Sequence, residues 1–166
     1  MKIHVLSKVE FDMTMKNNGI TNENVESKKD TFFISICGSD FLDDNGHYFT
    51  ENKSNVLNLD FDDCEKDMTV KEIGTNENIE LKAFTKEQAK EVLNFITIQK
   101  EKGMKTCVIH CAAGISRSAG CAVAINDFFG GDYKKFKYDN PQIQPNQHVV
   151  RLMNEVMRGI DYQSLS

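Results

Sequence analysis

The segment from Val108 to Gly120, VIHCAAGISRSAG, constrains the fold more than any other part of the sequence. It starts in the β-branched run TCVIH (residues 106–110), which is typical of a strand buried on both faces. An alanine-rich stretch follows at residues 116–129, and the two glycines after it predict the end of a helix. A strand that leads directly into a helix indicates an α/β fold with a parallel sheet, and such folds bind ligands where the strand ends.

Other segments repeat this alternation. Short apolar or alternating runs predict strands at residues 2–6, 32–37 and 54–63. Helical periodicity predicts helices at residues 85–103 and 146–159, each opened by a capping residue and ended by a glycine. The polar residues 16–30 indicate a loop or a surface helix. We therefore predict a single α/β domain, residues 1–166, with a central and mostly parallel sheet flanked by helices.

The chain of 166 residues has the size of one domain, and its net charge of −5 is spread along the sequence. We therefore do not expect duplex nucleic acid as a general partner. The amino terminus has no sustained apolar segment, and no run approaches the roughly 18 apolar residues that a membrane helix needs. Five cysteines without a CxxC pair fit neither a disulfide framework nor a zinc site. These features predict a cytoplasmic protein with reduced thiols, no membrane association and no bound metal.

The turn between the predicted strand and helix has the composition of an anion-binding loop. Its backbone N–H groups and the positive end of the helix dipole converge on one point. The residues concerned are Ala112, Ala113, Gly114, Ile115 and Ser116. Arg117 can hold two phosphate oxygens with its planar guanidinium, and the same field favours the thiolate form of Cys111. A thiolate aimed at a bound phosphoryl group indicates covalent catalysis through a cysteinyl phosphate.

A proton donor for the leaving oxygen is expected at the end of the strand predicted for residues 54–63, where Asp62 and Asp63 lie. If alternate apolar residues share one face of that strand, Asp63 continues the face, so we favour Asp63 and keep Asp62 as the alternative. Ser118 could donate a hydrogen bond to the departing sulfur, or it could simply be a small packing residue. His110 is expected to support the loop.

These residues resemble the signature loop of a known family. The string His110-Cys111, five residues, Arg117-Ser118 is similar to that of the cysteine-dependent protein tyrosine phosphatases, and VLNLDFDD and PNQHVVRL look like segments of a compact bacterial or phage dual-specificity enzyme. The resemblance implies that Cys111 is the nucleophile, that Arg117 and the loop amides bind phosphate, that Ser118 assists thiolate release and that Asp63 is the general acid. The tyrosine-recognition loop of the large classical enzymes has no counterpart, which predicts a shallow cleft.

The expected activity is the hydrolysis of phosphomonoesters, with phosphotyrosine and also phosphoserine or phosphothreonine in proteins as substrates. No cofactor is expected, the partner is a phosphorylated protein or peptide, and the chain is expected to be a monomer. One alternative is a phosphate-binding pseudophosphatase, which applies if neither aspartate reaches the pocket. The other is a nucleotide or RNA 5′-phosphatase, whose stacking surface would be the aromatic and basic cluster at residues 128–138.

Some residues keep more than one interpretation. Cys64 could form a protective disulfide with an oxidised Cys111, or it could be an incidental thiol. Three histidines show no ligand spacing and are predicted to be structural or on the surface: His4, His47 and His148. Nothing in residues 7–30 indicates whether that segment packs over the site.

Overall fold

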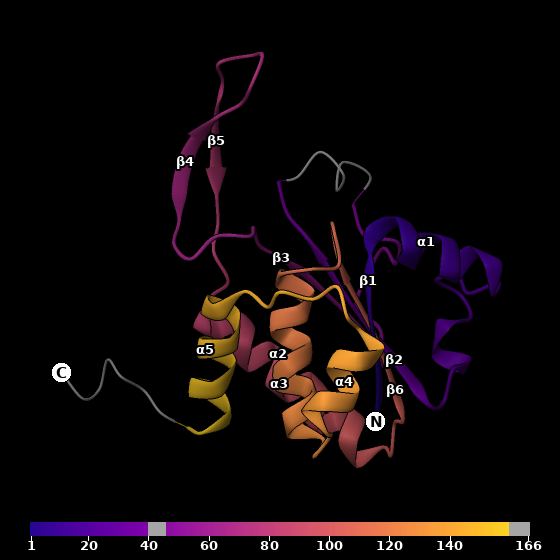
Figure 1. Cartoon of the computed structure of the whole chain (residues 1–166). Helices are drawn as coiled ribbons and strands as arrows, with labels where there is room; N and C mark the ends of the chain where they lie inside the picture. The colour runs from indigo at the N-terminus through magenta and orange to yellow at the C-terminus, as the bar shows by residue number, and fades with distance from the viewer. Residues whose placement is uncertain (40–45, 160–166) are drawn as a thin grey trace.

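A parallel four-stranded sheet forms the centre of the molecule (Figure 1). The structure, a computed structural model, describes residues 1–39 and 46–159; residues 40–45 and 160–166 of the predicted domain lie outside this description. The strands are ordered β1 (Lys2–Ser7), β6 (Thr106–Cys111), β2 (Thr31–Cys37) and β3 (Val56–Asp60). All three neighbouring pairs are parallel. The predicted α/β fold with a mostly parallel sheet is confirmed.

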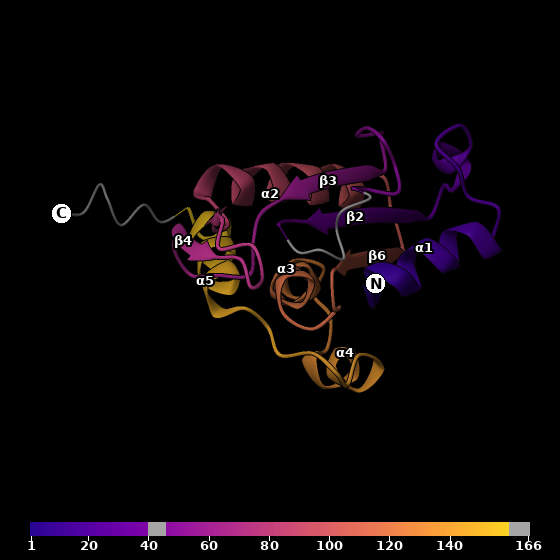
Figure 2. The same cartoon turned by 90° about the horizontal axis from the view of Figure 1, so that it is seen from above.

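Helices cover both faces of the sheet, and alternate strand residues supply the two cores. One core packs α2 (Lys86–Glu101), α3 (Arg117–Phe128) and α5 (Gln147–Met157) against the sheet face that carries Ile34 and Ile109. The second core packs α1 (Lys8–Asn17) against the face that carries Phe33 and Val108. Figure 2 shows α1 and α5 at opposite sides of the molecule. The central strands are apolar at nearly every position because both of their faces are buried.

The carboxyl ends of the strands meet at one edge of the sheet. The register pairs Ser35 of β2 with His110 of β6, and Cys37 of β2 with Asp60 of β3. The turns that follow β2, β3 and β6 therefore start side by side. This edge is where parallel α/β folds bind their ligands.

The strand predicted at residues 54–63 is shorter in the structure. Lys53 and Val56 exchange two backbone hydrogen bonds, so the residues between them form a turn before β3 begins. At the other end, the N–H of Asp62 donates to the carbonyl of Lys82 at 2.7 Å and no longer pairs with β2. The prediction of one long strand was therefore wrong at both ends, because backbone pairing passes to other partners there.

Several elements were not predicted from the sequence. In α1, the Ser7 hydroxyl accepts from the N–H of Glu10, and the Glu10 carboxylate accepts from the N–H of Ser7. Residues 16–30, predicted as loop or surface helix, include the end of α1 and the 3₁₀ turn η1 (Val25–Ser27). A short helix, α4 (Tyr133–Asp139), follows α3, and its N-cap is Asp132.

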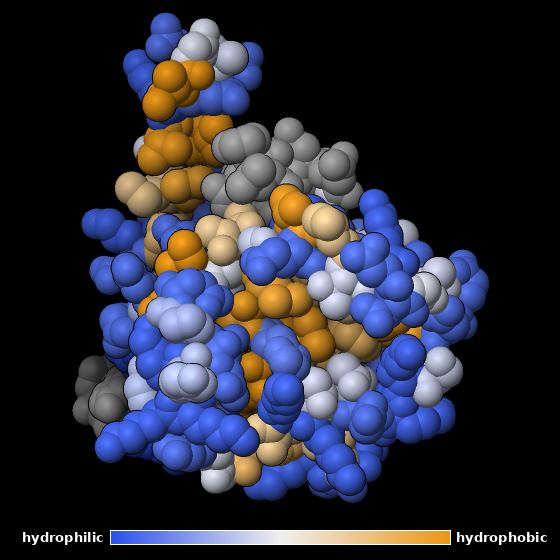
Figure 3. All heavy atoms as spheres, turned by 45° about the vertical axis from the view of Figure 1, so that its right-hand side comes forward, coloured by the Kyte–Doolittle hydropathy of each residue, from blue (hydrophilic) through white to orange (hydrophobic). Residues whose placement is uncertain are grey.

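A hairpin arm, also not predicted, rises from the body of the molecule (Figure 1). It consists of the antiparallel strands β4 (Met68–Lys71) and β5 (Asn78–Leu81). The register pairs Met68 with Leu81 and Val70 with Ile79, so the apolar side chains share one face. Figure 3 shows apolar residues along this arm.

The outer edge of β1 is covered by side-chain amides. Asn140 accepts a hydrogen bond from the N–H of Val5 at 2.8 Å and donates one to the carbonyl of Ile3 at 2.9 Å. These bonds satisfy backbone groups that a neighbouring strand would otherwise pair with, so they protect the edge from pairing with another strand. Within residues 1–39 and 46–159, every helix is too short or too polar to span a bilayer.

Candidate active site

The loop between β6 and α3 is the candidate phosphate site. Cys111 is the last residue of β6, and Arg117 is the first residue of α3. Gly114 has a φ of +70°, and a Cβ there would lie 2.5 Å from the carbonyl carbon of Leu6 and 2.6 Å from the nitrogen of Ser7. Only glycine fits this close approach, so the backbone of β1 fixes the outer edge of the loop.

The carbonyl groups of the loop are held from outside. Four of them accept hydrogen bonds: Ala112 from the N–H of Lys8 (3.2 Å), Gly114 from the Gln142 amide (3.2 Å), Ile115 from the N–H of Gln144 (2.8 Å) and Ser116 from the N–H of Asn146 (3.0 Å). In a trans peptide, the C=O of one residue and the N–H of the next point in opposite directions. The N–H groups of residues 113, 115, 116 and 117 therefore face the inside of the loop. Such a ring at a helix N-terminus binds an anion.

Cys111 lies at the base of this ring and is 2% exposed. Its Sγ atom is 3.0 Å from the Oγ atom of Ser118, which is fully buried in the first turn of α3. When the sulfur is a thiolate it can only accept, so the Ser118 hydroxyl must then donate. The positive end of the α3 dipole acts on the same sulfur. The geometry suits a nucleophile with a hydrogen-bond donor behind it.

Arg117 is anchored at the ends of two strands. The residue is 3% exposed, and its Nη1 donates to the carbonyl oxygen of Phe61 at 3.0 Å. Gly38, the residue after β2, leaves the space for this contact, because a Cβ there would lie 2.8 Å from Nη1 and 2.7 Å from the Phe61 oxygen. The guanidinium is thus fixed by the fold, which lowers the entropy lost when it binds two oxygens of a phosphate.

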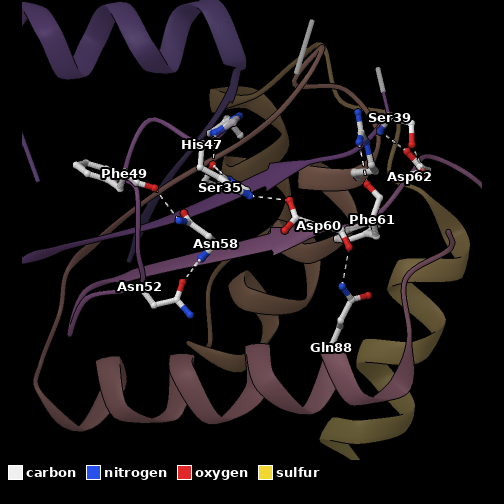
Figure 4. Close-up of polar contacts among 12 residues, drawn as sticks. Ser35, Ser39, His47, Phe49, Asn52, Asn58, Asp60, Phe61, Asp62 and Gln88 are labelled. Carbon is white, nitrogen blue, oxygen red and sulfur yellow. Dashed lines mark hydrogen bonds and ion pairs between the residues drawn. The ribbon is translucent and has the colours of Figure 1, made fainter. Parts of the chain in front are cut away.

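The two neighbouring aspartates have different environments. Asp62 is buried and accepts hydrogen bonds from the Ser39 N–H (2.6 Å), the Ser39 hydroxyl (3.2 Å) and the Lys82 N–H (2.8 Å). Figure 4 shows the carboxylate of Asp62 directed at Ser39. A buried carboxylate with three donors stabilises the surrounding turns and is badly placed to deliver a proton to a substrate.

Asp63 is exposed and lies at the rim of the phosphate loop. Its Oδ1 accepts hydrogen bonds from the Ser116 hydroxyl and from the Asn146 side-chain amide, both at 2.8 Å. The strand-face argument that favoured this residue was wrong, because β3 ends at Asp60 and does not reach Asp63. The residue comes to the loop through Ser116 and Asn146 instead. Its role as general acid stays a prediction.

His110 is buried behind the loop and is neutral at ordinary pH. Its pKa is lowered to about 3, first by burial and to a lesser extent by the nearby charges of Lys8, His47 and Arg117, against one opposing hydrogen bond to the Cys111 backbone. Its Nδ1 lies 3.3 Å from the carbonyl oxygen of Cys111. A neutral imidazole in this place can donate only one hydrogen bond, so its tautomer decides what it holds.

The other thiols are less suited to reaction. Burial raises the pKa of Cys121 to about 12 and also raises that of Cys107. The pKa of Cys64 is raised by burial and then by the acids around it, the first of which is Asp62. Reactive cysteines are thiolates, so these environments favour inert thiols. For Cys64 this supports the interpretation as an incidental thiol.

The aromatic and basic cluster at residues 128–138 lies away from the loop. Lys135 and Phe136 of α4 line a cavity together with Lys2 and Lys105. Those lysines stand at the amino ends of β1 and β6, whereas the phosphate loop follows the carboxyl end of β6. The cluster therefore gives no stacking surface beside Cys111.

Several residues of the site were missed in the sequence. Lys8 begins α1, and its buried ammonium pairs with Asp12 at 3.0 Å close to the loop. Asn146 was predicted only as a helix cap; it is one, accepting from the N–H of Val149, but it also donates to Asp63. The contact of Asn146 with Asp63 has no local sequence signal, because it joins segments 83 positions apart, whereas Lys8 and Asp12 are an i,i+4 pair within α1.

Comparison with known proteins gives the fold. The sequence matches no family model, and no curated protein matches it. Among solved structures, PTP-2 phosphatase of Cydia pomonella aligns with 92% of this chain and 84% of its own, with a TM-score of 0.54 and 20% identity. The chain has a protein tyrosine phosphatase-like fold. This likeness establishes the architecture, and the activity must be argued from the site.

Other solved structures are also similar. A human tyrosine phosphatase-like serine/threonine/tyrosine-interacting protein aligns over 81% of each chain, with a TM-score of 0.48 and 22% identity. Tk-PTP in the active form aligns over 84% of this chain and 88% of its own, with a TM-score of 0.41 and 16% identity.

Proposed function

We propose that the protein is a phosphatase that hydrolyses phosphomonoesters of proteins, phosphotyrosine first among them, through a cysteinyl-phosphate intermediate. The observation that carries this proposal is the orientation of the loop peptides around Cys111: their carbonyls are bonded outward, so their N–H groups face the sulfur's side of the loop. Such a ring is complementary to the oxygens of a phosphoryl group in the transition state.

In the first step, the ring and Arg117 bind the phosphate, and the Cys111 thiolate attacks phosphorus. A sulfur–phosphorus bond forms while the ester oxygen–phosphorus bond breaks. Asp63, protonated, gives its proton to the leaving oxygen from the rim of the loop, where Ser116 and Asn146 hold it.

In the second step, water attacks phosphorus and the Asp63 carboxylate takes a proton from that water. The sulfur–phosphorus bond breaks and the thiolate leaves. The Ser118 hydroxyl, 3.0 Å from Sγ, donates a hydrogen bond to the sulfur as its charge returns.

The mouth of the loop suits a protein substrate. Ala113 is exposed, and Ile115 is 39% exposed, so apolar surface lies beside the bound phosphate. This surface can contact the ring or alkyl part of a phosphorylated side chain. The contact between Asp63 and Ser116 favours turnover over the pseudophosphatase alternative, and the distant α4 cluster disfavours the RNA alternative.

The test is hydrolysis of p-nitrophenyl phosphate and of a panel of phosphotyrosyl, phosphoseryl and phosphothreonyl peptides and a 5′-phosphorylated oligonucleotide, in EDTA and reductant. Cys111→Ser should abolish turnover and keep vanadate binding, whereas the matched control Cys64→Ser should keep turnover. Substantial turnover by Cys111→Ser would overturn the nucleophile assignment. Vanadate binding without any turnover by the wild type would support the pseudophosphatase. Preference for the oligonucleotide would overturn the substrate class.

A further inference from the structure

A chain of four polar side chains runs from the surface to the phosphate loop. The Asp60 carboxylate is 2.8 Å from His47 Nε2, and His47 Nδ1 is 2.6 Å from the Ser35 hydroxyl. The same hydroxyl is 2.7 Å from His110 Nε2, and His110 Nδ1 faces the Cys111 carbonyl at 3.3 Å. Figure 4 shows Asp60, Ser35 and His47 grouped at the ends of β2 and β3. The Asp60 side chain is 78% exposed and that of His47 only 14%, so the chain leads inward.

The direction of each hydrogen bond in this chain follows from the atoms. A backbone carbonyl only accepts, so His110 must carry its proton on Nδ1 to hold Cys111, and its Nε2 must then accept. Ser35 therefore donates to His110 and accepts from His47 Nδ1. Asp60 also accepts, so His47 Nε2 must donate as well. All four contacts are made together only when His47 carries both protons and is a cation.

When His47 loses one proton, the hydrogen bonds between His47, Ser35 and His110 reverse their direction. Neutral His47 keeps the proton on Nε2, because the bond to the charged Asp60 is the stronger of its two bonds. Its Nδ1 then accepts, and the Ser35 hydroxyl turns to donate to it. His110 must now donate from Nε2 to Ser35, so its Nδ1 no longer holds Cys111. The two states differ by one proton released to solvent.

We propose that His47 is a positioning residue for the phosphate loop. It sets the tautomer of His110 through Ser35, and Asp60 determines which proton His47 keeps. The protonated state holds the carbonyl of Cys111 and keeps the loop closed on its anion; the neutral state releases it. Because the two states differ by one proton on the imidazole of His47, the device responds to pH. It rests on the proposed function only for its effect on catalysis.

Other charged groups lie around this chain. From α1, the Lys8 ammonium and its partner Asp12 face the region, and from α3 the Arg117 guanidinium does. The Phe11 ring packs on the His110 ring with centroids 4.4 Å apart. Burial first, and then the charges of Lys8 and Arg117, keep His110 neutral, so its response is limited to a change of tautomer. The charge change itself falls on His47, the histidine nearer the surface.

Asp60→Asn gives a sharp test, because residue 60 is exposed and the change keeps its shape. An asparagine amide can donate to His47 Nε2, so neutral His47 can carry its proton on Nδ1. Each hydrogen bond of the network then keeps the same donor and the same acceptor from Ser35 to Cys111 at every pH. The control is His4→Gln, a histidine on β1 outside this chain.

Two-bond ¹H–¹⁵N spectra of the histidine rings report the tautomers without any need for turnover. In the wild type and in His4→Gln, His110 should change from the Nδ1–H to the Nε2–H form as His47 loses its proton. In Asp60→Asn, His110 should keep the Nδ1–H form throughout. A His110 tautomer that stays fixed in the wild type while His47 titrates would overturn the proposal, as would a change that persists in Asp60→Asn.

Binding of inorganic phosphate measures the consequence for the loop. Across the His47 titration, the affinity of the wild type should fall about fivefold more than that of Asp60→Asn, which is the value of about one hydrogen bond. The ionisation of inorganic phosphate is the same in both measurements and cancels. Equal pH dependence in the two would overturn the link to the loop. A tautomer change without turnover would overturn the proposed function alone, and turnover with a fixed tautomer would overturn this inference alone.

Discussion

The phosphate loop and the segment that follows β3 face each other across the site, and they are built in different ways. The loop is held on its outer side by Lys8, Gln142, Gln144 and Asn146, and Cys111 and Arg117 are nearly inaccessible. The segment from Phe61 to Thr85 is mostly exposed and extends into the β4–β5 arm. The fold thus fixes the proposed anion site in advance, whereas Asp63, the proposed acid, lies on a segment that is mostly exposed.

The largest effect is expected on the exposed side of this comparison. Asp63→Asn should lower kcat by about 10²- to 10⁴-fold for a phosphotyrosyl peptide, because its leaving oxygen must be protonated. The acid works only while protonated, so the wild-type rate should fall as pH rises, and the variant should lose that alkaline limb. Initial rates across pH with a phosphotyrosyl peptide measure both.

p-Nitrophenyl phosphate is the control for this variant, because its leaving group departs readily without a proton and the loss should be far smaller. An equal loss for both substrates would contradict the role of Asp63 as general acid.

Arg117→Lys tests the phosphate loop, which is the constrained side of the comparison. A lysine keeps the charge but loses the planar pair of donors, and it cannot bond the Phe61 carbonyl and two phosphate oxygens together. We expect kcat/KM to fall by about 10²- to 10³-fold, with KM raised and kcat lowered. Steady-state kinetics and vanadate titration measure this, and an unchanged KM would show that the guanidinium is not a phosphate ligand.

Asp62→Asn tests whether Asp62 has a structural role or a catalytic one. Its buried carboxylate accepts three hydrogen bonds, and an asparagine would place a donor against one of those donors. The free energy of unfolding should fall by about 1–3 kcal/mol, measured by urea denaturation. The alkaline limb of the rate profile should remain; if this variant loses the limb and Asp63→Asn keeps it, Asp62 is the acid.

The smallest effect is expected from the arm. Replacing residues 68–81 by a short glycine-containing turn should leave the hydrolysis of p-nitrophenyl phosphate unchanged, because the arm contributes no residue to the loop and exposed hairpins tolerate such changes. A marked loss of this activity would show that the arm orders Asp63, and the two sides of the comparison would then not be independent.

Much of the buried side could be predicted from the sequence, because its signals are local. The β-branched run ending at Cys111, the small residues after it and the helix that begins at Arg117 are contiguous in the chain. A strand, a turn and a helix in that order leave few arrangements, and all of them bring the loop amides together. The geometry of Cys111 and Ser118 follows from this short segment.

The exposed side could be predicted only in part. Asp63 was favoured because a longer strand was expected, yet it reaches the loop through Ser116 and Asn146, and Asn146 lies 83 positions away in sequence. The capping box of Ser7 and Glu10 could have revealed α1 and was overlooked. His47 had no signal at all, because its partners Ser35 and Asp60 lie on β2 and β3. Long-range contacts between polar side chains leave no periodic pattern to detect.

In the proposed mechanism Cys111 carries the phosphoryl group between the two steps, and trapping that intermediate tests this role most directly. Ser118→Ala, mixed with a phosphotyrosyl peptide and quenched in acid, should accumulate the adduct, because the departing thiolate loses its hydrogen-bond donor. Peptide mapping by mass spectrometry should place one phosphoryl group on Cys111. A phosphoryl group on any other residue, or rapid turnover with no phosphorylated enzyme at any quench time, would contradict the account.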